Sequence, residues 1–185
     1  MIETIKQDAE ERMGKAVANL KKEFASIRTG KASPALLDRI VVDYYGVPTP
    51  LNQMAGVSAP EARMLLIQPW DKSALGNIEK AILKSDLGLT PPNDGSVIRL
   101  VIPQLTQDSR KELGKKVKKF GEEAKVAVRN IRRDSNDEIK KLEKAKEITE
   151  DDSKAAQDVI QKMTDKYVAE VDKTAANKEA EIMEI

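Results

Sequence analysis

All eight prolines of this 185-residue chain lie between Pro34 and Pro103. Proline inside a helix removes a backbone hydrogen bond and clashes with the preceding turn, so long helices exclude it. Residues 1–33 and 104–185 can therefore form long helices, whereas the middle of the chain must turn often. The contrast predicts a proline-containing region inserted between helical segments.

Apolar side chains recur every three or four positions in the proline-free segments, which is the spacing of one helix face. The expected helices cover 2–27, from Thr106 as N-cap to about 145, and from Thr149 towards the C-terminus. Thr149 has an acid three residues on, Asp152, as helix N-termini often do. The apolar stripe expected on the first helix is Ile2, Ile5, Ala9, Met13, Ala16, Leu20, Phe24 and Ile27; on the second it is Leu113, Val117, Phe120, Ala124, Ala127, Ile131, Ile139 and Leu142; on the third it is Ala156, Val159, Met163, Tyr167, Val171, Ala175 and Ile182.

None of these helices can bury its stripe alone, and the short link at 145–148 makes the second and third antiparallel neighbours. We therefore expect an α+β fold: a long antiparallel three-helix bundle of residues 1–29 and 105–185, with a small β/α/β domain of residues 31–103 inserted in it. Two linkers must join the domains, and they form a candidate hinge at Gly30, Lys31, Pro103, Gln104 and Leu105. A rigid interface that fixes one interdomain angle is an equal alternative.

The inserted region combines strand, turn and short-helix signals. Strands are expected at Leu36–Tyr45, Met64–Ile67 and Val97–Ile102. A short helix capped by Ser73, with Ile78, Ala81 and Ile82 inward, is expected to end at Gly88. Turns are expected at Pro48–Pro50 and Pro91–Gly95.

Composition removes several classes of function. The chain has no cysteine and no histidine, which excludes disulfides, thiol nucleophiles and the usual zinc ligands, so we expect no metal and no cofactor. Adjacent acids such as Glu122 and Glu123 are usually solvated, so an enzyme is the least favoured class. A signal peptide and a run of about 18 apolar residues are both absent from the sequence, which predicts a cytoplasmic protein.

Positive charge is concentrated on the second predicted helix. Between Arg110 and Arg133 there are ten basic and three acidic residues, a net of +7, although the whole chain carries only +1. Seven basic side chains project within about 60° of one line, roughly opposite the apolar stripe. They are Lys111, Lys115, Lys118, Lys125, Arg129, Arg132 and Arg133.

A solvated bundle face is one interpretation of this charge, and a contact with RNA or an acidic protein is the other. A face of one sign over several turns favours a contact, because solubilising surfaces normally mix signs. Aromatic residues are only 3 % of the chain, so base stacking is disfavoured and phosphate recognition on structured RNA is expected. Arg28 joins this surface or serves as the C-terminal dipole partner of the first helix.

Several motifs, taken together and in order, resemble the bacterial ribosome recycling factor (ribosome-releasing factor) family. They are Ile27–Pro34, Tyr44–Gly46, Pro48–Leu51, Ser85–Leu89 and Val126–Asp134. The resemblance covers essentially the whole chain, and it implies an L-shaped, transfer-RNA-sized translation factor without enzymatic activity. It further implies that the protein binds the post-termination ribosome and, with elongation factor G and GTP hydrolysis by that factor, splits it into subunits.

In such a protein the bundle binds large-subunit ribosomal RNA (rRNA) near the inter-subunit bridge. Family contacts carry over to Arg28, Arg129 and Arg132. With the cationic stripe, the candidate rRNA-binding residues are Arg132, Arg129, Arg28, Arg133, Lys125, Lys118 and Arg110. Two positions depart from the family pattern: Lys31 replaces the usual arginine, and Ser109 replaces the first of a common arginine pair. Bidentate phosphate contacts are not expected at those two positions. We expect a monomer, and a coiled-coil protein that oligomerises through its long helices is the alternative.

Overall fold

The computed structural model describes residues 1–185 with the exception of 86, 88, 90, 93 and 185. Its described residues form two compact units, one of residues 1–24 and 114–180 and one of residues 25–113 and 181–185. The first is a helical bundle, and the described residues of the second contain two small antiparallel sheets with the α-helix Leu75–Lys84, so the predicted α+β fold class is confirmed. The units divide inside the long helices, and the predicted domain limits stay a prediction.

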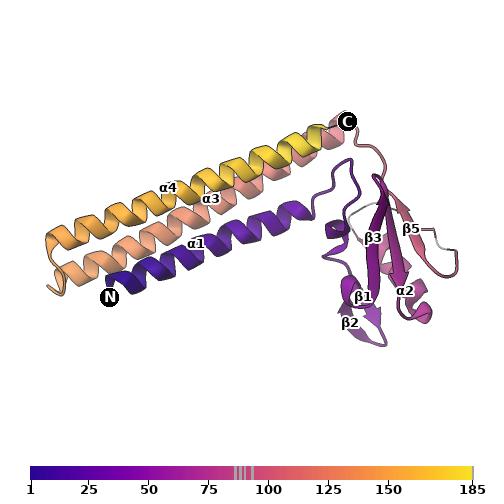
Figure 1. Ribbon diagram of the computed structural model, residues 1–185, viewed down its shortest axis with the longest axis horizontal. Helices are drawn as coiled ribbons and strands as arrows, with labels where there is room; N and C mark the ends of the chain where they lie inside the picture. The colour runs from indigo at the N-terminus through magenta and orange to yellow at the C-terminus, as the bar shows by residue number, and fades with distance from the viewer. Residues whose placement is uncertain (86, 88, 90, 93, 185) are drawn as a thin grey trace. The chain divides into compact units, whose positions relative to one another are not determined.

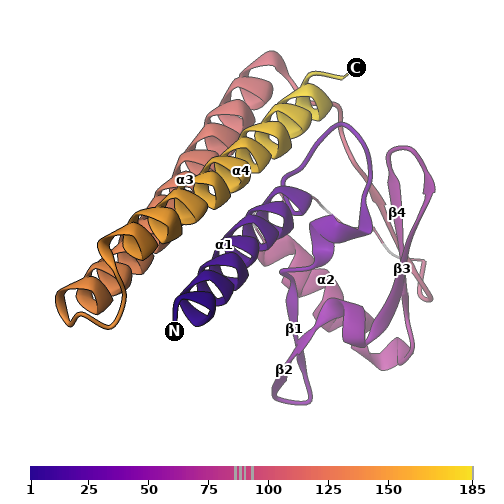
Figure 2. The same cartoon turned by 60° about the vertical axis from the view of Figure 1, so that its left-hand side comes forward.

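Three helices form the first unit: α1 (Ile2–Ala25), α3 (Gln107–Lys144) and α4 (Glu150–Met183). They lie side by side along their length (Figures 1 and 2). Polar contacts connect every pair of helices. Tyr167 on α4 donates a hydrogen bond to Glu10 on α1 at 2.6 Å, and Arg12 forms an ion pair with Asp134 on α3 at 3.2 Å.

The buried face of α3 differs from the predicted stripe. Phe120 and Ala127 are only half-buried, whereas Val128 is fully buried. The predicted stripe included neither Gly121 nor Ser135, which also lie on the buried side and move its centre towards α4. The buried residues of α3 are Val117, Gly121, Ala124, Val128, Ile131, Ser135 and Ile139.

A similar correction applies to the other two helices. Val17 is buried where Ala16 was expected, and Ile160 is fully buried where Val159, 39 % exposed, was expected. Two adjacent apolar residues lie about 100° apart on a helix, so a choice between them rotates the predicted face by that angle. Only the neighbouring helices decide which one is enclosed.

The N-caps predicted for the two long helices α3 and α4 are confirmed. The backbone N–H of Ser109 donates to Thr106 Oγ1 at 3.0 Å at the start of α3. At the start of α4, the Asp152 N–H donates to Thr149 Oγ1 at 3.0 Å, and the Thr149 N–H donates back to the Asp152 carboxylate at 3.3 Å. This reciprocal pair is a capping box, which satisfies two backbone donors that the helix itself leaves free.

The second unit contains two antiparallel sheets among its described residues. Strands β1 (Val41–Tyr44) and β2 (Val47–Pro50) pair as a hairpin. Strands β3 (Ala55–Glu61), β4 (Met64–Pro69) and β5 (Ile98–Val101) form a three-stranded sheet in the order β3-β4-β5.

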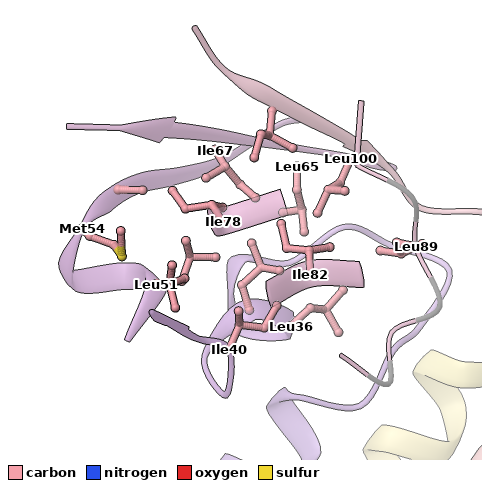
Figure 3. Close-up of a cluster of buried hydrophobic side chains, with 14 of the residues drawn as sticks. Leu36, Ile40, Leu51, Met54, Leu65, Ile67, Ile78, Ile82, Leu89 and Leu100 are labelled. Carbon is pink, nitrogen blue, oxygen red and sulfur yellow. The ribbon is translucent and has the colours of Figure 1, made fainter. Parts of the chain in front are cut away.

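Helix α2 (Leu75–Lys84) packs against these strands, and its Ile78 and Ile82 are fully buried. Figure 3 shows these side chains beside Leu65, Ile67 and Leu100 from the three-stranded sheet. Short 3₁₀ segments at Pro34–Leu37 and Leu51–Gln53 add further leucines to the same core. The core is therefore built from residues between Leu36 and Ile102.

Several local predictions in this unit are wrong. Leu36 and Leu37 lie in a 3₁₀ segment, because the Pro34 ring favours a helical turn after the Ser33 cap, and the strand begins only at Val41. Pro48–Pro50 is part of β2 rather than a turn. The hairpin pairs on one side only, which leaves room for residues without an N–H.

The helix in this unit is capped differently from the prediction. Asp71, not Ser73, is the N-cap of the 3₁₀ turn Lys72–Ala74 that leads into α2, and it accepts a hydrogen bond from the Ser73 N–H at 3.0 Å. The predicted helix stop at Gly88 lies outside the described residues, as does Asn93 of the predicted turn at Pro91–Gly95.

Candidate nucleic-acid interface

Two arginines and one lysine of the predicted set lie exposed on α3. Arg129 and Arg133 are about one helical turn apart and share one face of α3. Lys118 lies about three turns before Arg129. Within the part of the chain that the structure describes, none of the three forms a hydrogen bond or an ion pair. Their charges are therefore available to a polyanion without the loss of an internal partner.

Lys125 occupies a different environment, and the expectation that it faces solvent is wrong. Its side chain is only 18 % exposed, and its Nζ lies 2.5 Å from Asp172 Oδ1 and 3.3 Å from Glu122 Oε1. The hydrogen bond to Asp172 is the largest cause that raises the pKa of Lys125. Because the buried face of α3 is centred nearer α4 than predicted, position 125 lies at the border between the two helices.

Arg132 lies at the same α3–α4 border and is half-buried. Its Nη1 donates a hydrogen bond to the side-chain oxygen of Gln161 on α4 at 3.1 Å. Gln161 is neutral, so this contact leaves the charge of Arg132 unmatched, in contrast to that of Lys125. Sequence reasoning missed Gln161 because a single polar residue on a solvated helix carries no signal of its partner.

Arg28 and Arg110 belong to the second unit. Arg28 lies beyond the end of α1, and its Nη2 donates to the carbonyl oxygen of Pro103 at 3.1 Å. This bond joins the residue two positions before Gly30 to the second predicted linker, and its acceptor is not a carbonyl of α1, so the helix-dipole interpretation is not favoured. The Nε atoms of Arg28 and Arg110 are buried without a hydrogen-bond partner among the described residues.

The first predicted linker also contacts the end of α4. Lys31 Nζ lies 3.0 Å from Glu184 Oε2 in an exposed ion pair, and the Lys31 N–H donates to Thr29 Oγ1 at 3.2 Å. A Cβ atom added to Gly30 would meet its nearest neighbour, the Glu184 carbonyl oxygen, at 4.0 Å. The linker therefore has room for a small side chain at position 30.

A groove of about 380 Å³ lies between α1 and α3. Phe120 and Ala127 help to line it, which accounts for their partial exposure. Its polar lining mixes signs, with Arg12 and Lys15 against Glu23 and Glu123. Such a mixture does not favour a phosphate site, because anions are repelled by the acids.

The described residues contain no group of three or more histidine, cysteine, aspartate or glutamate side chains that could hold a metal ion. No helix formed by these residues has the length and apolar character needed to cross a membrane.

Comparison with known families identifies the chain. The model of the family "Ribosome recycling factor" matches residues 20–183. The chain belongs to the ribosome recycling factor family. Curated family members include the ribosome-recycling factors of Heliobacterium modesticaldum, with 61 % identity, and of Brevibacillus brevis and Geobacillus kaustophilus, each with 60 %. Each alignment covers 100 % of both chains.

Solved structures of ribosome recycling factors share this fold. A solution structure of the ribosome recycling factor matches with a TM-score of 0.79 and 43 % identity, over 100 % of this chain and 98 % of that one. A second match, with a TM-score of 0.69, 44 % identity and full coverage of both chains, is to models of the T. thermophilus ribosome recycling factor and the E. coli elongation factor G bound to the E. coli post-termination complex. The family resemblance inferred from the sequence motifs is thereby confirmed.

In this member of the family, the predicted rRNA-binding residues differ in their surroundings. Arg129, Arg133 and Lys118 are exposed, Lys125 is neutralised, and Arg132 is held by an uncharged partner. Arg28 and Arg110 belong to the other compact unit, and each has a buried Nε atom.

Proposed function

We propose that this member of the ribosome recycling factor family binds the post-termination bacterial ribosome and, with elongation factor G, splits it into subunits. GTP hydrolysis by the elongation factor supplies the work, and the chain itself is not an enzyme and needs no cofactor. The observation that carries the proposal is identity of about 60 % over the full length of proteins named ribosome-recycling factor. A ribosomal substrate implies action in the cytoplasm, and the chain acts as a monomer.

Contact with the ribosome is proposed to use the cationic face of α3 against large-subunit rRNA near the inter-subunit bridge. An exposed guanidinium with no internal partner can donate two parallel hydrogen bonds to one phosphate. Arg129 and Arg133 have this property, and Arg132 keeps its charge beside Gln161. Lys125 is expected to contribute less, because binding RNA would require it to leave Asp172.

Arg28 and Arg110 complete the proposed rRNA-binding set from the second unit. The single hydrogen bond between Arg28 and Pro103 uses one of the five donors of the guanidinium. The Nε atom of Arg28 is buried, so only its remaining Nη donors can contact phosphate while the bond holds Arg28 to the second linker. Gly30, Lys31, Pro103, Gln104 and Leu105 are proposed to form the hinge between the bundle and the inserted domain.

Cosedimentation with isolated large ribosomal subunits tests the proposal. Arg132→Ala is expected to weaken binding at least tenfold, because an arginine–phosphate contact is lost, while the melting temperature stays unchanged. Lys162→Ala is the matched control, because it removes one exposed α4 cation that forms no hydrogen bond or ion pair within the described part of the chain. Unchanged affinity of Arg132→Ala would overturn the assignment of this face.

The salt dependence of the same binding gives a second readout. Each phosphate neutralised contributes roughly −0.7 to −0.9 to the slope of log K against log salt concentration. Arg129→Ala and Arg133→Ala are each expected to make the slope shallower by about one such unit. The slope for Lys125→Ala should change less, because that charge is already matched by Asp172.

A further inference from the structure

Gln161 on α4 lies between a cation and an anion. Its side-chain oxygen accepts a hydrogen bond from Arg132 Nη1 at 3.1 Å, and its side-chain nitrogen donates one to Asp165 Oδ1 at 2.9 Å. Asp165 is one helical turn further along α4, so both contacts come from residues fixed by two long helices. No other hydrogen bond or ion pair of Arg132 is present in the described part of the chain.

The orientation of the Gln161 amide follows from the chemistry of its partners. An arginine side chain can only donate hydrogen bonds, and an ionised aspartate can only accept them. The amide oxygen must therefore face Arg132, and the amide nitrogen must face Asp165. The opposite orientation would break both bonds at once, so Asp165 holds the acceptor of Gln161 towards the guanidinium.

We propose that Gln161, oriented by Asp165, is a positioning residue that presents the Arg132 guanidinium to an rRNA phosphate. This inference rests on the proposed function, in which Arg132 contacts the rRNA. The bond to Gln161 fixes one edge of a side chain that otherwise samples many rotamers. The Arg132 guanidinium is then partly ordered before RNA binds, so less side-chain entropy is lost on association.

The same helix border shows why the partner is an amide rather than a carboxylate. Eleven residues along α4 from Gln161, Asp172 pairs with Lys125 and neutralises it. Gln161 offers Arg132 a side-chain oxygen as acceptor, as a carboxylate would, but the amide carries no charge. Arg132 is thus oriented without being neutralised, which is the condition for an attractive contact with phosphate.

Variants at position 161 test the proposal by cosedimentation with large subunits. Gln161→Ala is expected to weaken binding about three- to tenfold, the effect of one hydrogen bond, without changing the melting temperature. Gln161→Glu is expected to weaken binding further and to make the salt slope shallower, since its carboxylate would neutralise Arg132. Gln157→Ala is the matched control, because the amide of Gln157 donates to Ser153 and not to Arg132.

A double-mutant cycle separates positioning from a direct or structural role. In an Arg132→Ala background, Gln161→Ala should have no further effect on binding. An equal effect in both backgrounds would overturn the proposal, because Gln161 would then act without Arg132. Wild-type affinity of both Gln161 variants, with Arg132→Ala still weak, would also overturn it and leave the proposed function intact. Wild-type affinity of Arg132→Ala would instead contradict the proposed function itself.

Discussion

At the scale of single residues, Lys146 adopts a backbone conformation that favours glycine. Its φ is 59°, in the left-handed region. The N–H groups of Lys146 and Glu147 donate to the carbonyls of Glu143 and Leu142 at 2.9 and 3.0 Å, so the end of α3 is a Schellman motif. A lysine at this point carries a steric cost that glycine would not.

Lys146→Gly is therefore expected to be about 1 kcal/mol more stable than Lys146→Ala. Both substitutions remove the same charge near the helix C-terminus, so their difference isolates the backbone effect. Urea denaturation would measure it. Equal unfolding free energies of the two variants would show that this turn relaxes out of the left-handed conformation at no cost.

Asp94 is a second residue with a specific environment. Its carboxylate accepts hydrogen bonds from the backbone N–H groups of Val97 and Ser96, each at 3.0 Å, and from Arg99 at 2.6 Å. These bonds, led by the one from Val97, lower the pKa of Asp94 to about 2. The folded form thus holds the proton less tightly than the unfolded chain, in which the carboxyl has its ordinary pKa of 3.8.

The stabilisation from Asp94 is accordingly present above pH 3.8 and is lost as the pH falls through about 2. Asp94→Asn should melt at a lower temperature than the wild type at pH 6, and the two melting curves should converge near pH 2. Thermal melts at a series of pH values would measure this convergence. A difference in melting temperature between wild type and Asp94→Asn that stays constant with pH would mean that the ionised carboxylate gives no extra stability.

At the scale of elements, sequence reasoning succeeded where the signal is local. The N-caps at Thr106 and Thr149 were predictable because a cap depends on hydrogen bonds within three residues. Strand β3 was missed: Ala55–Glu61 contains Gly56 and Pro60 and has little strand propensity of its own. Its structure comes from pairing with β4, which the local sequence does not encode.

The helix faces illustrate the same limit at the candidate site. The positive charge of α3 was visible in the sequence, but the burial of Val128 and the pairing of Lys125 with Asp172 depend on where α4 packs. The Arg132–Gln161 contact joins residues 29 apart in the chain. The sequence therefore shows that α3 is rich in positive charge, but not which of its cations have a charged partner in the fold.

The capping box of α4 gives a prediction at this scale. Thr149→Ala should lower the free energy of unfolding by about 1 kcal/mol, because the Asp152 N–H loses its acceptor. Thr149→Ser keeps the hydroxyl and should retain most of that stability. Chemical denaturation of the two variants would check it, and an equally large loss in both would assign the effect to the threonine methyl group instead.

At the scale of the whole molecule, the proposed hinge leads to a functional prediction. The Gly30 backbone does not occupy the left-handed region, and the structure has room for a Cβ atom. Gly30→Ala therefore fits the present conformation, but it restricts the others that a hinge must adopt.

Gly30→Ala is expected to slow subunit splitting more than it weakens binding to the large subunit. Light scattering of post-termination ribosomes with elongation factor G and GTP would measure splitting, and cosedimentation would measure binding. Gly76→Ala is the matched control, because Gly76 lies in α2 outside the proposed hinge and an added Cβ atom would meet no other atom within 4 Å. Equal losses in both assays of Gly30→Ala would identify the linker as a rigid spacer.

The connection of α1 to the rest of the bundle also sets an order of events during synthesis. Glu10 on α1 bonds to Tyr167 on α4, and the two residues are separated by 157 positions. The core between Leu36 and Ile102, by contrast, is complete once about half of the chain has been made. The inserted core can therefore fold while the chain is still being made. The apolar face of α1, by contrast, stays exposed until α4 has been synthesised, when translation is almost finished.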